Sequence, residues 1–191
     1  ALERAHEDTR SYYWIGFTPD WQANDERHRV DVDVPGLRRA RVRTRDSFSD
    51  LSAGTEATLR LESAQLFDLP VPGAGTLTVE VGEPEDGGWN KVVVPMAVRI
   101  PLDQVTHLPT AEGWATRLEL RFAVTDDRGD RADIPVVPLV FQRAEEPSEG
   151  DTEVYIAELK MRERPHRVLV SLVDPATGEE LSTKLEVNPT L

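Results

Sequence analysis

The sequence predicts a mainly β protein: an antiparallel, immunoglobulin-like β-sandwich with an N-terminal helix, a β-hairpin and one further helix. From residue 75 onward, nearly every segment alternates in polarity or is rich in β-branched residues. Short turns separate these segments, which favours antiparallel pairing over the helical crossovers of a parallel sheet. Four prolines fall where we expect edges, bulges or strand ends: Pro95, Pro101, Pro135 and Pro138.

The N-terminal segment predicts a helix followed by a strand. Residues 1–10 contain helix-forming residues, and Leu2, Ala5 and Thr9 share roughly one face. Residues 11–19 form an aromatic and β-branched run that ends in proline, which is typical of a strand. Large apolar groups fall on both of its faces, so we expect burial on two sides, as at a junction between domains.

A β-hairpin and a second helix are predicted next. Residues 27–34 alternate in polarity, a Pro-Gly turn follows, and residues 37–44 run back as the second strand. Residues 50–67 change period, because small and apolar residues recur at helical spacing and Asp50 or Ser52 can cap the start. Part of this segment also alternates like a strand, but we expect one amphipathic helix that ends before the next proline.

Seven short strands are predicted in the remainder of the chain. Their expected bounds are residues 76–81, 91–100, 115–125, 132–141, 153–161, 166–173 and 181–187. Residues 144–151 are linker-like and are expected to form a long loop within the sandwich. The chain therefore divides into an N-terminal segment (1–19), a hairpin-and-helix segment (20–72) and a β-sandwich domain (73–191).

Composition and charge exclude several function classes. The net charge of −13 argues against a nucleic-acid partner, and the lack of Cys removes disulfides, thiolate zinc sites and cysteine nucleophiles. No apolar run approaches the roughly 20 residues that span a bilayer. The sequence also lacks a P-loop, a G-x-S-x-G elbow and a metal-ligating histidine pair. We therefore expect no enzyme activity, no catalytic or metal-ligating residue and no cofactor.

One basic stripe interrupts the acidic background. Residues 26–45 contain seven Arg and three acidic residues, a local charge of +4. The period of two places Arg39, Arg41, Arg43 and Arg45 on one strand face. Such a stripe suits either a solvated face paired with acids across the hairpin or a site for phosphate or an acidic partner. We favour the solvated face.

Exposed rings and clustered carboxylates are the other candidate binding features. Trp89 and Trp114 lie in turn-like settings, where a ring either covers the end of the sandwich or marks a contact or carbohydrate site. Four carboxylates surround one glycine-containing turn and suit either a plain hairpin turn or a Ca²⁺ ion. They are Asp126, Asp127, Asp130 and Asp133. In both cases we favour the structural role over the binding role.

Four segments near the N-terminus form a recognisable pattern. Residues 7–19 read EDTRSYYWIGFTP, and HRV, PGL and VRTR follow at 28–30, 35–37 and 42–45. These segments resemble the C-terminal region of the bacterial von Willebrand factor A-related proteins of the acidobacterial type. In that family a tyrosine-rich strand follows the last helix of the A domain, and a basic hairpin and a β-rich tail come next. Residues 45–48 read RDSF where the family has an Arg-Arg-Gly-Tyr-like motif.

The resemblance implies a piece of a longer, exported protein that begins in the last helix of an A domain. The family's metal site lies in the A domain proper, and its Asp-x-Ser-x-Ser signature is missing here. The nearest match, residues 46–50, has Phe48 where the first Ser is needed, so no metal ligand is carried over.

The function implied by the resemblance is a non-catalytic protein-interaction or structural β module outside the cytoplasm, either periplasmic or secreted. Its partner is a protein of unknown identity, with the A domain of the same chain as one candidate. Two alternatives remain open from the residues alone. They are a carbohydrate- or calcium-binding β-sandwich module and an accessory domain of a hydrolase.

Overall fold

The computed structural model describes residues 15–33, 35–36 and 45–190. The chain divides into two compact units, residues 1–50 and 51–191. The predicted N-terminal helix over residues 1–10 lies outside the described residues. No helix in the described part of the chain is long and apolar enough to cross a membrane.

In the first unit, part of the first strand of the predicted hairpin is present, but it pairs with residues 47–49, which the sequence does not predict as a strand. β1 (Arg27–Arg29) pairs with β2 (Ser47–Ser49). The predicted strand over residues 27–34 is therefore shorter than expected, and residues 30–33 belong to no strand. The predicted returning strand over residues 37–44 lies outside the described residues.

The described part of the predicted aromatic strand, residues 15–19, is not a strand. Ile15 and Phe17 are exposed, so the prediction of burial on two sides is wrong for these residues. Phe17 instead meets Phe48 edge to face, with the ring centroids 5.9 Å apart. Phe48 also meets Trp21 edge to face and stacks on the histidine of β1. No described strand pairs with this segment, and Phe17 contacts the rest of the unit through its ring.

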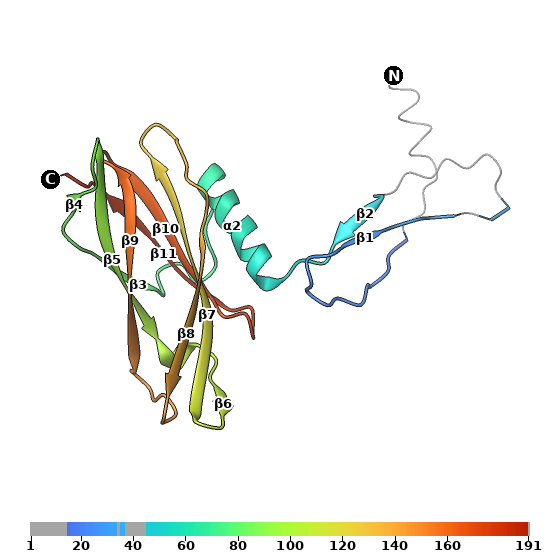
Figure 1. The fold of residues 1–191 in the computed structure, drawn as a ribbon. Helices are drawn as coiled ribbons and strands as arrows, with labels where there is room; N and C mark the ends of the chain where they lie inside the picture. The colour runs from blue at the N-terminus through green and yellow to red at the C-terminus, as the bar shows by residue number, and fades with distance from the viewer. Residues whose placement is uncertain (1–14, 34, 37–44, 191) are drawn as a thin grey trace, which may run out of the picture. The chain divides into compact units, whose positions relative to one another are not determined.

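In the second unit, two antiparallel sheets form a β-sandwich, as predicted (Figure 1). Its strands are β3 (Thr78–Val81), β4 (Glu85–Asp86), β5 (Lys91–Pro101), β6 (Leu108–Thr110), β7 (Gly113–Asp126), β8 (Val136–Arg143), β9 (Thr152–Arg162), β10 (His166–Val173) and β11 (Glu180–Val187). A short 3₁₀ helix, η1 (Leu102–Gln104), follows β5. One sheet has the order β11–β10–β7, with β6 and β8 also paired to β7. In the other sheet, β5 pairs with β3, β4 and β9.

All seven predicted strands are present, and most of their bounds agree within two residues. The largest difference is at β8, which is predicted from residue 132 but begins at Val136. The proline at 135 lacks a backbone donor, so the ladder with β7 begins after it. Two short strands of this unit, β4 and β6, are not predicted.

The core lies between the two sheets. The inward-facing residues of β5 are fully buried: Val92, Val94, Met96, Val98 and Ile100. They form one cluster with buried residues of β7 and β10, including Leu120, Phe122 and Val170. Because the outward-facing residues of β5 are less buried, the period of two in this strand accounts for its packing.

Pro95 lies inside the central strand β5, where the missing backbone donor is costly. Its carbonyl accepts a hydrogen bond from the N–H of Gly82 at 2.8 Å, in the gap between β3 and β4. Its nitrogen therefore faces a break in the neighbouring strand. Pro101 ends β5, and Pro138 lies in β8, which among the described strands pairs with β7 alone. The expectation of edges, bulges or strand ends is therefore met at Pro101 and Pro138, but it is wrong for Pro95, which a gap in the neighbouring strand accommodates inside a central strand.

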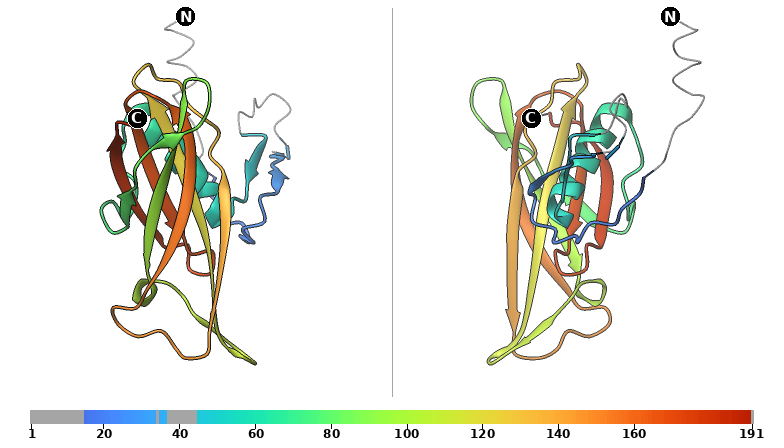
Figure 2. Two further views of the ribbon diagram at one scale, coloured as in Figure 1. Left: turned by 60° about the vertical axis from the view of Figure 1, so that its left-hand side comes forward. Right: turned by 90° about the vertical axis from the view of Figure 1, so that its right-hand side faces the viewer.

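The predicted second helix is also confirmed as α2 (Ala53–Phe67), which covers the outer face of the sheet that contains β7 and β10 (Figure 2). The Ser52 hydroxyl caps its N-terminus by accepting a hydrogen bond from the N–H of Thr55. Leu61 and Ala64 are buried against Leu169 and a β7 alanine, which fixes the helix on the sheet.

Candidate functional site

The two tryptophans that the sequence singles out lie at opposite ends of the sandwich. Trp89 lies in the turn between β4 and β5, next to the Lys91–Arg162 pair that ends the β5–β9 ladder. Trp114 lies at the start of β7, opposite Arg143 at the end of β8. Figure 1 shows β4 and β6, the strands that precede these residues, at the two ends. The two rings therefore belong to separate surfaces.

Trp89 is fully exposed, with a relative accessible surface of 100%. Three hydrogen bonds hold the turn that carries it. Gly87 N–H donates to the Lys91 carbonyl at 3.0 Å, Lys91 N–H donates to the Gly88 carbonyl at 3.1 Å, and Gly88 N–H donates to Asp86 Oδ1 at 2.8 Å. Gly88 has a φ of +74°, a value that favours glycine. The expectation that this ring covers the end of the sandwich is wrong, because the turn holds it in solvent.

A groove of about 320 Å³ opens near this turn, between the edges of the two sheets. Its floor is apolar and consists of Phe122 and Val124 from β7 with Leu159 and Met161 from β9. The groove exists because β8 pairs with β7 only as far as Arg121, which leaves the last part of β7 without a strand on this side. Its rim carries charges of both signs, from Lys91, Asp126, Asp130, Arg131, Asp133, Glu158, Lys160 and Arg162.

Asp126 organises the turn beside this groove. Its Oδ1 accepts hydrogen bonds from the backbone N–H groups of Arg128 and Asp130, at 3.0 and 2.9 Å. Its Oδ2 accepts from Arg162 and Arg164, at 3.4 and 3.1 Å. Burial raises the pKa of Asp126, but these donors and guanidinium charges outweigh burial and hold the pKa below its ordinary value.

Three of the four carboxylates of this turn, Asp126, Asp127 and Asp130, form ion pairs with arginines. Asp130 Oδ2 accepts a 2.7 Å hydrogen bond from Arg162, which also contacts Asp126. Nowhere in the described ranges do three or more His, Asp or Glu side chains form a group that could hold a metal ion. The arrangement here is that of a hairpin turn neutralised by arginine side chains.

Trp114 lines a hollow of about 340 Å³ at the opposite end of the sandwich. The ring is half-buried, and the other lining residues are Thr110, Ala111, Glu112, Gln142, Arg143 and Ala144. Asp151 and Glu153 form ion pairs with Arg143, at 3.1 and 3.4 Å, and orient its guanidinium. The hollow thus combines an aromatic ring with hydroxyl, amide, carboxylate and guanidinium groups.

The basic stripe remains a prediction. Arg39, Arg41 and Arg43 lie outside the described residues, and Arg45 is exposed in the first unit. Asp31 of the expected partner strand forms an ion pair at 3.2 Å with Arg29 of the same segment.

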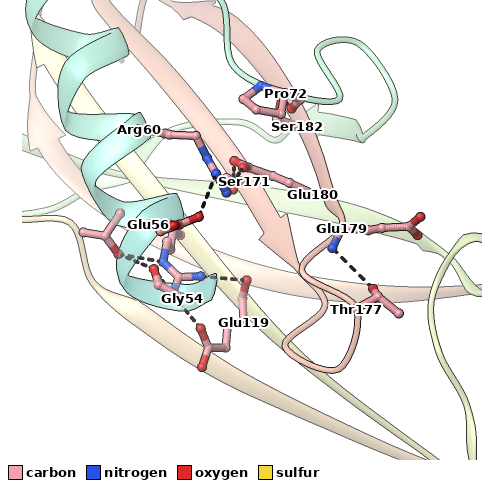
Figure 3. A network of polar contacts seen from close by, with 12 residues as sticks. Gly54, Glu56, Arg60, Pro72, Glu119, Ser171, Thr177, Glu179, Glu180 and Ser182 are labelled. Carbon is pink, nitrogen blue, oxygen red and sulfur yellow. Dashed lines mark hydrogen bonds and ion pairs between the residues drawn. The ribbon is translucent and has the colours of Figure 1, made fainter. Parts of the chain in front are cut away.

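A buried polar network lies under α2 (Figure 3). The sequence does not predict it. Arg121 of β7 is 1% exposed and donates to Thr58 Oγ1 at 2.9 Å and to the Gly54 carbonyl at 3.0 Å. It also pairs with Glu119 at 2.5 Å. The only sequence signal for this site is a pair of charges on the outward-facing positions of a strand, which ordinarily indicates a solvated face.

Glu180 extends the same network at the first residue of β11 (Figure 3). Its buried carboxylate accepts a 2.6 Å hydrogen bond from the Ser171 hydroxyl and forms a 3.3 Å ion pair with Arg60 of α2. These contacts join the helix to two strands of the sheet. The network therefore has a structural role: it specifies how α2 docks.

No protein-family model and no curated protein matches the chain. Solved structures with some similarity include a Bacteroides uniformis β-glucuronidase, at 13% identity over 58% of this chain and 12% of that chain, with a TM-score of 0.36. Another is a Northeast Structural Genomics Consortium target, at 16% identity over 61% of this chain and 88% of that chain, with a TM-score of 0.35.

Proposed function

We propose that the chain is a non-catalytic protein-interaction module of an exported, A-domain-containing bacterial protein, and that Trp89 is its main contact residue. The observation that carries the proposal is a fully exposed indole on a turn held by three hydrogen bonds. Tryptophan is the residue type most enriched among those that dominate binding energy. An ordered turn also lowers the entropy lost when such a residue is immobilised by a partner.

The surroundings of Trp89 fit a protein partner. The nearby groove offers an apolar floor of about four side chains, which suits an apolar side chain of the partner. Its rim carries Lys91, Arg131 and Lys160 together with Asp133 and Glu158. Charges of both signs at a rim contribute orientation and specificity more than affinity.

The first partner to test is the A domain of the same protein. This choice, and the location outside the cytoplasm, rest on the family resemblance of residues 7–45. A separate protein recognised in the periplasm or outside the cell is the other possibility within the same proposal.

The test is site-specific photo-cross-linking in the bacterium that encodes the protein. A photoreactive amino acid replaces Trp89 in the full-length protein, and a matched control carries it at Glu149, an exposed position in the loop between β8 and β9. We expect a product from position 89 that maps to the A domain or to another polypeptide. No product at 89, or the same products from both positions, would contradict the proposal.

A second candidate function is saccharide binding at the Trp114 hollow. The observation that favours it is the combination of a half-buried indole with amide, carboxylate and guanidinium groups around one hollow. Glycan-array binding that is lost in Trp114→Ala and kept in Trp89→Ala would support this function. Absence of glycan binding by the native chain would exclude it.

A further inference from the structure

The edge strands of the sandwich differ in how well they are protected from pairing with another chain. A free edge exposes a row of backbone N–H and C=O groups, which natural proteins usually shorten, interrupt or cover. β6 has three residues. The edge formed by β3 and β4 is broken between residues 81 and 85. β8 carries Pro138, which removes one backbone donor.

β11 is protected by the segment that precedes β3. Ser182 N–H donates to the Gly73 carbonyl at 3.1 Å, and Gly75 N–H donates to the Ser182 carbonyl at 2.8 Å. Gly73 has a φ of +64°, and a Cβ atom there would lie 2.1 Å from the Glu180 carbonyl oxygen. Only glycine allows this close approach, so the cover is built into the fold.

β9 carries none of these protections. It pairs with β5 at all eleven of its positions, from Thr152 to Arg162, and contains no proline and no glycine. No described strand pairs with its other side. It is therefore a long, regular and open edge.

The register shows which residues of β9 face the open edge. Pro95 directs its carbonyl toward Gly82 and so away from β9. Its partner Glu158 is therefore in a non-hydrogen-bonded pair and directs its own N–H and C=O away from β5. By alternation, the same holds for Ile156 and Lys160.

The open edge is apolar at one end and electrically balanced overall. Val154 and Ile156 are 46% and 64% exposed on the outward face of the strand. β9 contains Glu153, Glu158, Lys160 and Arg162, so its formal charge is zero in a chain of −13. The edge itself therefore adds no net charge to the repulsion between two copies of this chain.

We propose that β9 pairs antiparallel with β9 of a second copy of this chain, about a two-fold axis at Leu159. This register places Glu158 of each copy directly opposite Lys160 of the other, so two symmetric pairs of opposite charge form. It also places Ile156 opposite the aliphatic stem of the second copy's Arg162. The two four-stranded sheets then form one continuous sheet across the dimer.

Neighbouring registers are less favourable. A two-fold axis at Glu158 would place Glu158 opposite Glu158 of the second copy, so that two carboxylates repel. An axis at Ala157 would place the apolar Ile156 opposite Glu158 of the second copy. The dimer does not use Trp89, but Glu158 and Lys160 also lie on the rim of the groove, so a second copy and a partner in the groove would compete for these two side chains. The tests remain distinct, because cross-linking at position 89 reports the partner and sedimentation of the chain alone reports the dimer.

The test measures self-association by sedimentation velocity from about 10 µM to 1 mM, a range that covers weak dimers. The variants are Glu158→Lys, Lys160→Glu and the double exchange. Each single variant creates two like-charge pairs, so we expect the dimer Kd to rise about tenfold or more, whereas the double exchange restores it. Glu186→Lys on the exposed part of β11 is the control for total charge.

The control separates pairing from net charge. Glu158→Lys and Glu186→Lys both make the chain less acidic by two charges, which by itself favours association. If β9 pairs as proposed, Glu158→Lys weakens association although it lowers the net negative charge. A native chain that stays monomeric at the highest concentration, or a double exchange as weak as the single variants, would overturn the proposal.

Amide hydrogen exchange provides an independent readout. On dimer formation, we expect the N–H groups of Ile156, Glu158 and Lys160 to gain protection, since these face the open edge. The N–H groups of Ala157 and Leu159 already bond to β5 and should change little. If the N–H groups of Ile156, Glu158 and Lys160 are no better protected in the dimer than in the monomer, the dimer contact lies elsewhere and the proposal is wrong.

Discussion

Asp126 is nearly buried, yet its carboxylate stays charged because two backbone N–H groups and two guanidinium groups face it. The pKa of Asp126 is consequently lower in the folded chain than the value of about 3.9 in an unfolded chain. The stability that this difference provides is present above about pH 4. It is lost as the pH falls through the lowered folded pKa.

Asp126→Asn should therefore destabilise the chain at pH 7, and the difference from the native chain should shrink below about pH 4. Urea unfolding at pH 7 and at about pH 2.5 measures both effects. The control is Asp127→Asn, since Asp127 is more exposed and lies 3.9 Å from Arg164. We expect this control to have a smaller effect at pH 7. A difference for Asp126→Asn that is the same at both pH values would contradict this account.

Arg121 is buried although its place in the strand pattern predicts a solvated side chain. The alternation in β7 places Leu118, Leu120 and Phe122 toward the core, as observed. It places Arg121 on the outward face, which is usually solvated, but α2 covers that face and buries the guanidinium. The burial depends on where a distant segment docks, so no local pattern predicts it.

Trp89 and Trp114 differ in exposure, and the sequence does not predict this difference. Both lie in turn-like settings, but Trp89 is fully exposed and Trp114 is half-buried. The difference follows from their neighbours. Trp114 pairs with Pro109 and Arg143 on either side, whereas the turn of Trp89 projects beyond its ladder.

At the scale of elements, α2 depends on a cap and on one buried stripe. Leu61→Ala should lower the free energy of unfolding by about 2 to 5 kcal/mol, because the residue is fully buried against the sheet. Ser52→Ala should cost about 1 kcal/mol through loss of the cap. Urea unfolding measures both.

Leu59→Ala is the matched control for this prediction. Leu59 lies on the exposed side of the same helix, so the same substitution should change the free energy of unfolding by less than about 0.5 kcal/mol. Equal effects at positions 59 and 61 would show that packing of the Leu61 side chain on the sheet does not stabilise α2.

The strands were predictable because their apolar periodicity is strong and their turns contain Asp, Gly and Pro. β10 has the predicted bounds, and β5 exceeds them by one residue. The short strands β4 and β6 were not predictable, since two or three residues carry no period. The groove was not predictable either, because it depends on where β8 begins relative to the end of β7.

At the scale of the whole molecule, the chain divides into two compact units between residues 50 and 51. Both core clusters of buried apolar residues lie within residues 51–191, and α2 packs on β7 and β10. The second unit therefore holds its own core, which is the condition for independent folding.

A chain of residues 51–191 should fold alone and unfold in one cooperative transition, with a midpoint close to that of the sandwich in the full chain. A chain of residues 69–191, which lacks α2, should be less stable by several kcal/mol because Leu169 and Arg121 lose their cover. Calorimetry distinguishes these results. Failure of 51–191 to fold would contradict the two-unit organisation.

The most direct test of the interaction proposal is the affinity for the partner identified by cross-linking, measured by calorimetry for the native chain, Trp89→Ala and Trp114→Ala. Because Trp89 is fully exposed, its replacement should leave the free energy of unfolding within about 0.5 kcal/mol. We predict that Trp89→Ala raises the Kd about 30-fold or more, while Trp114→Ala changes it less than about twofold. A Trp89→Ala chain that binds as tightly as the native chain would contradict the claim that this residue is the main contact.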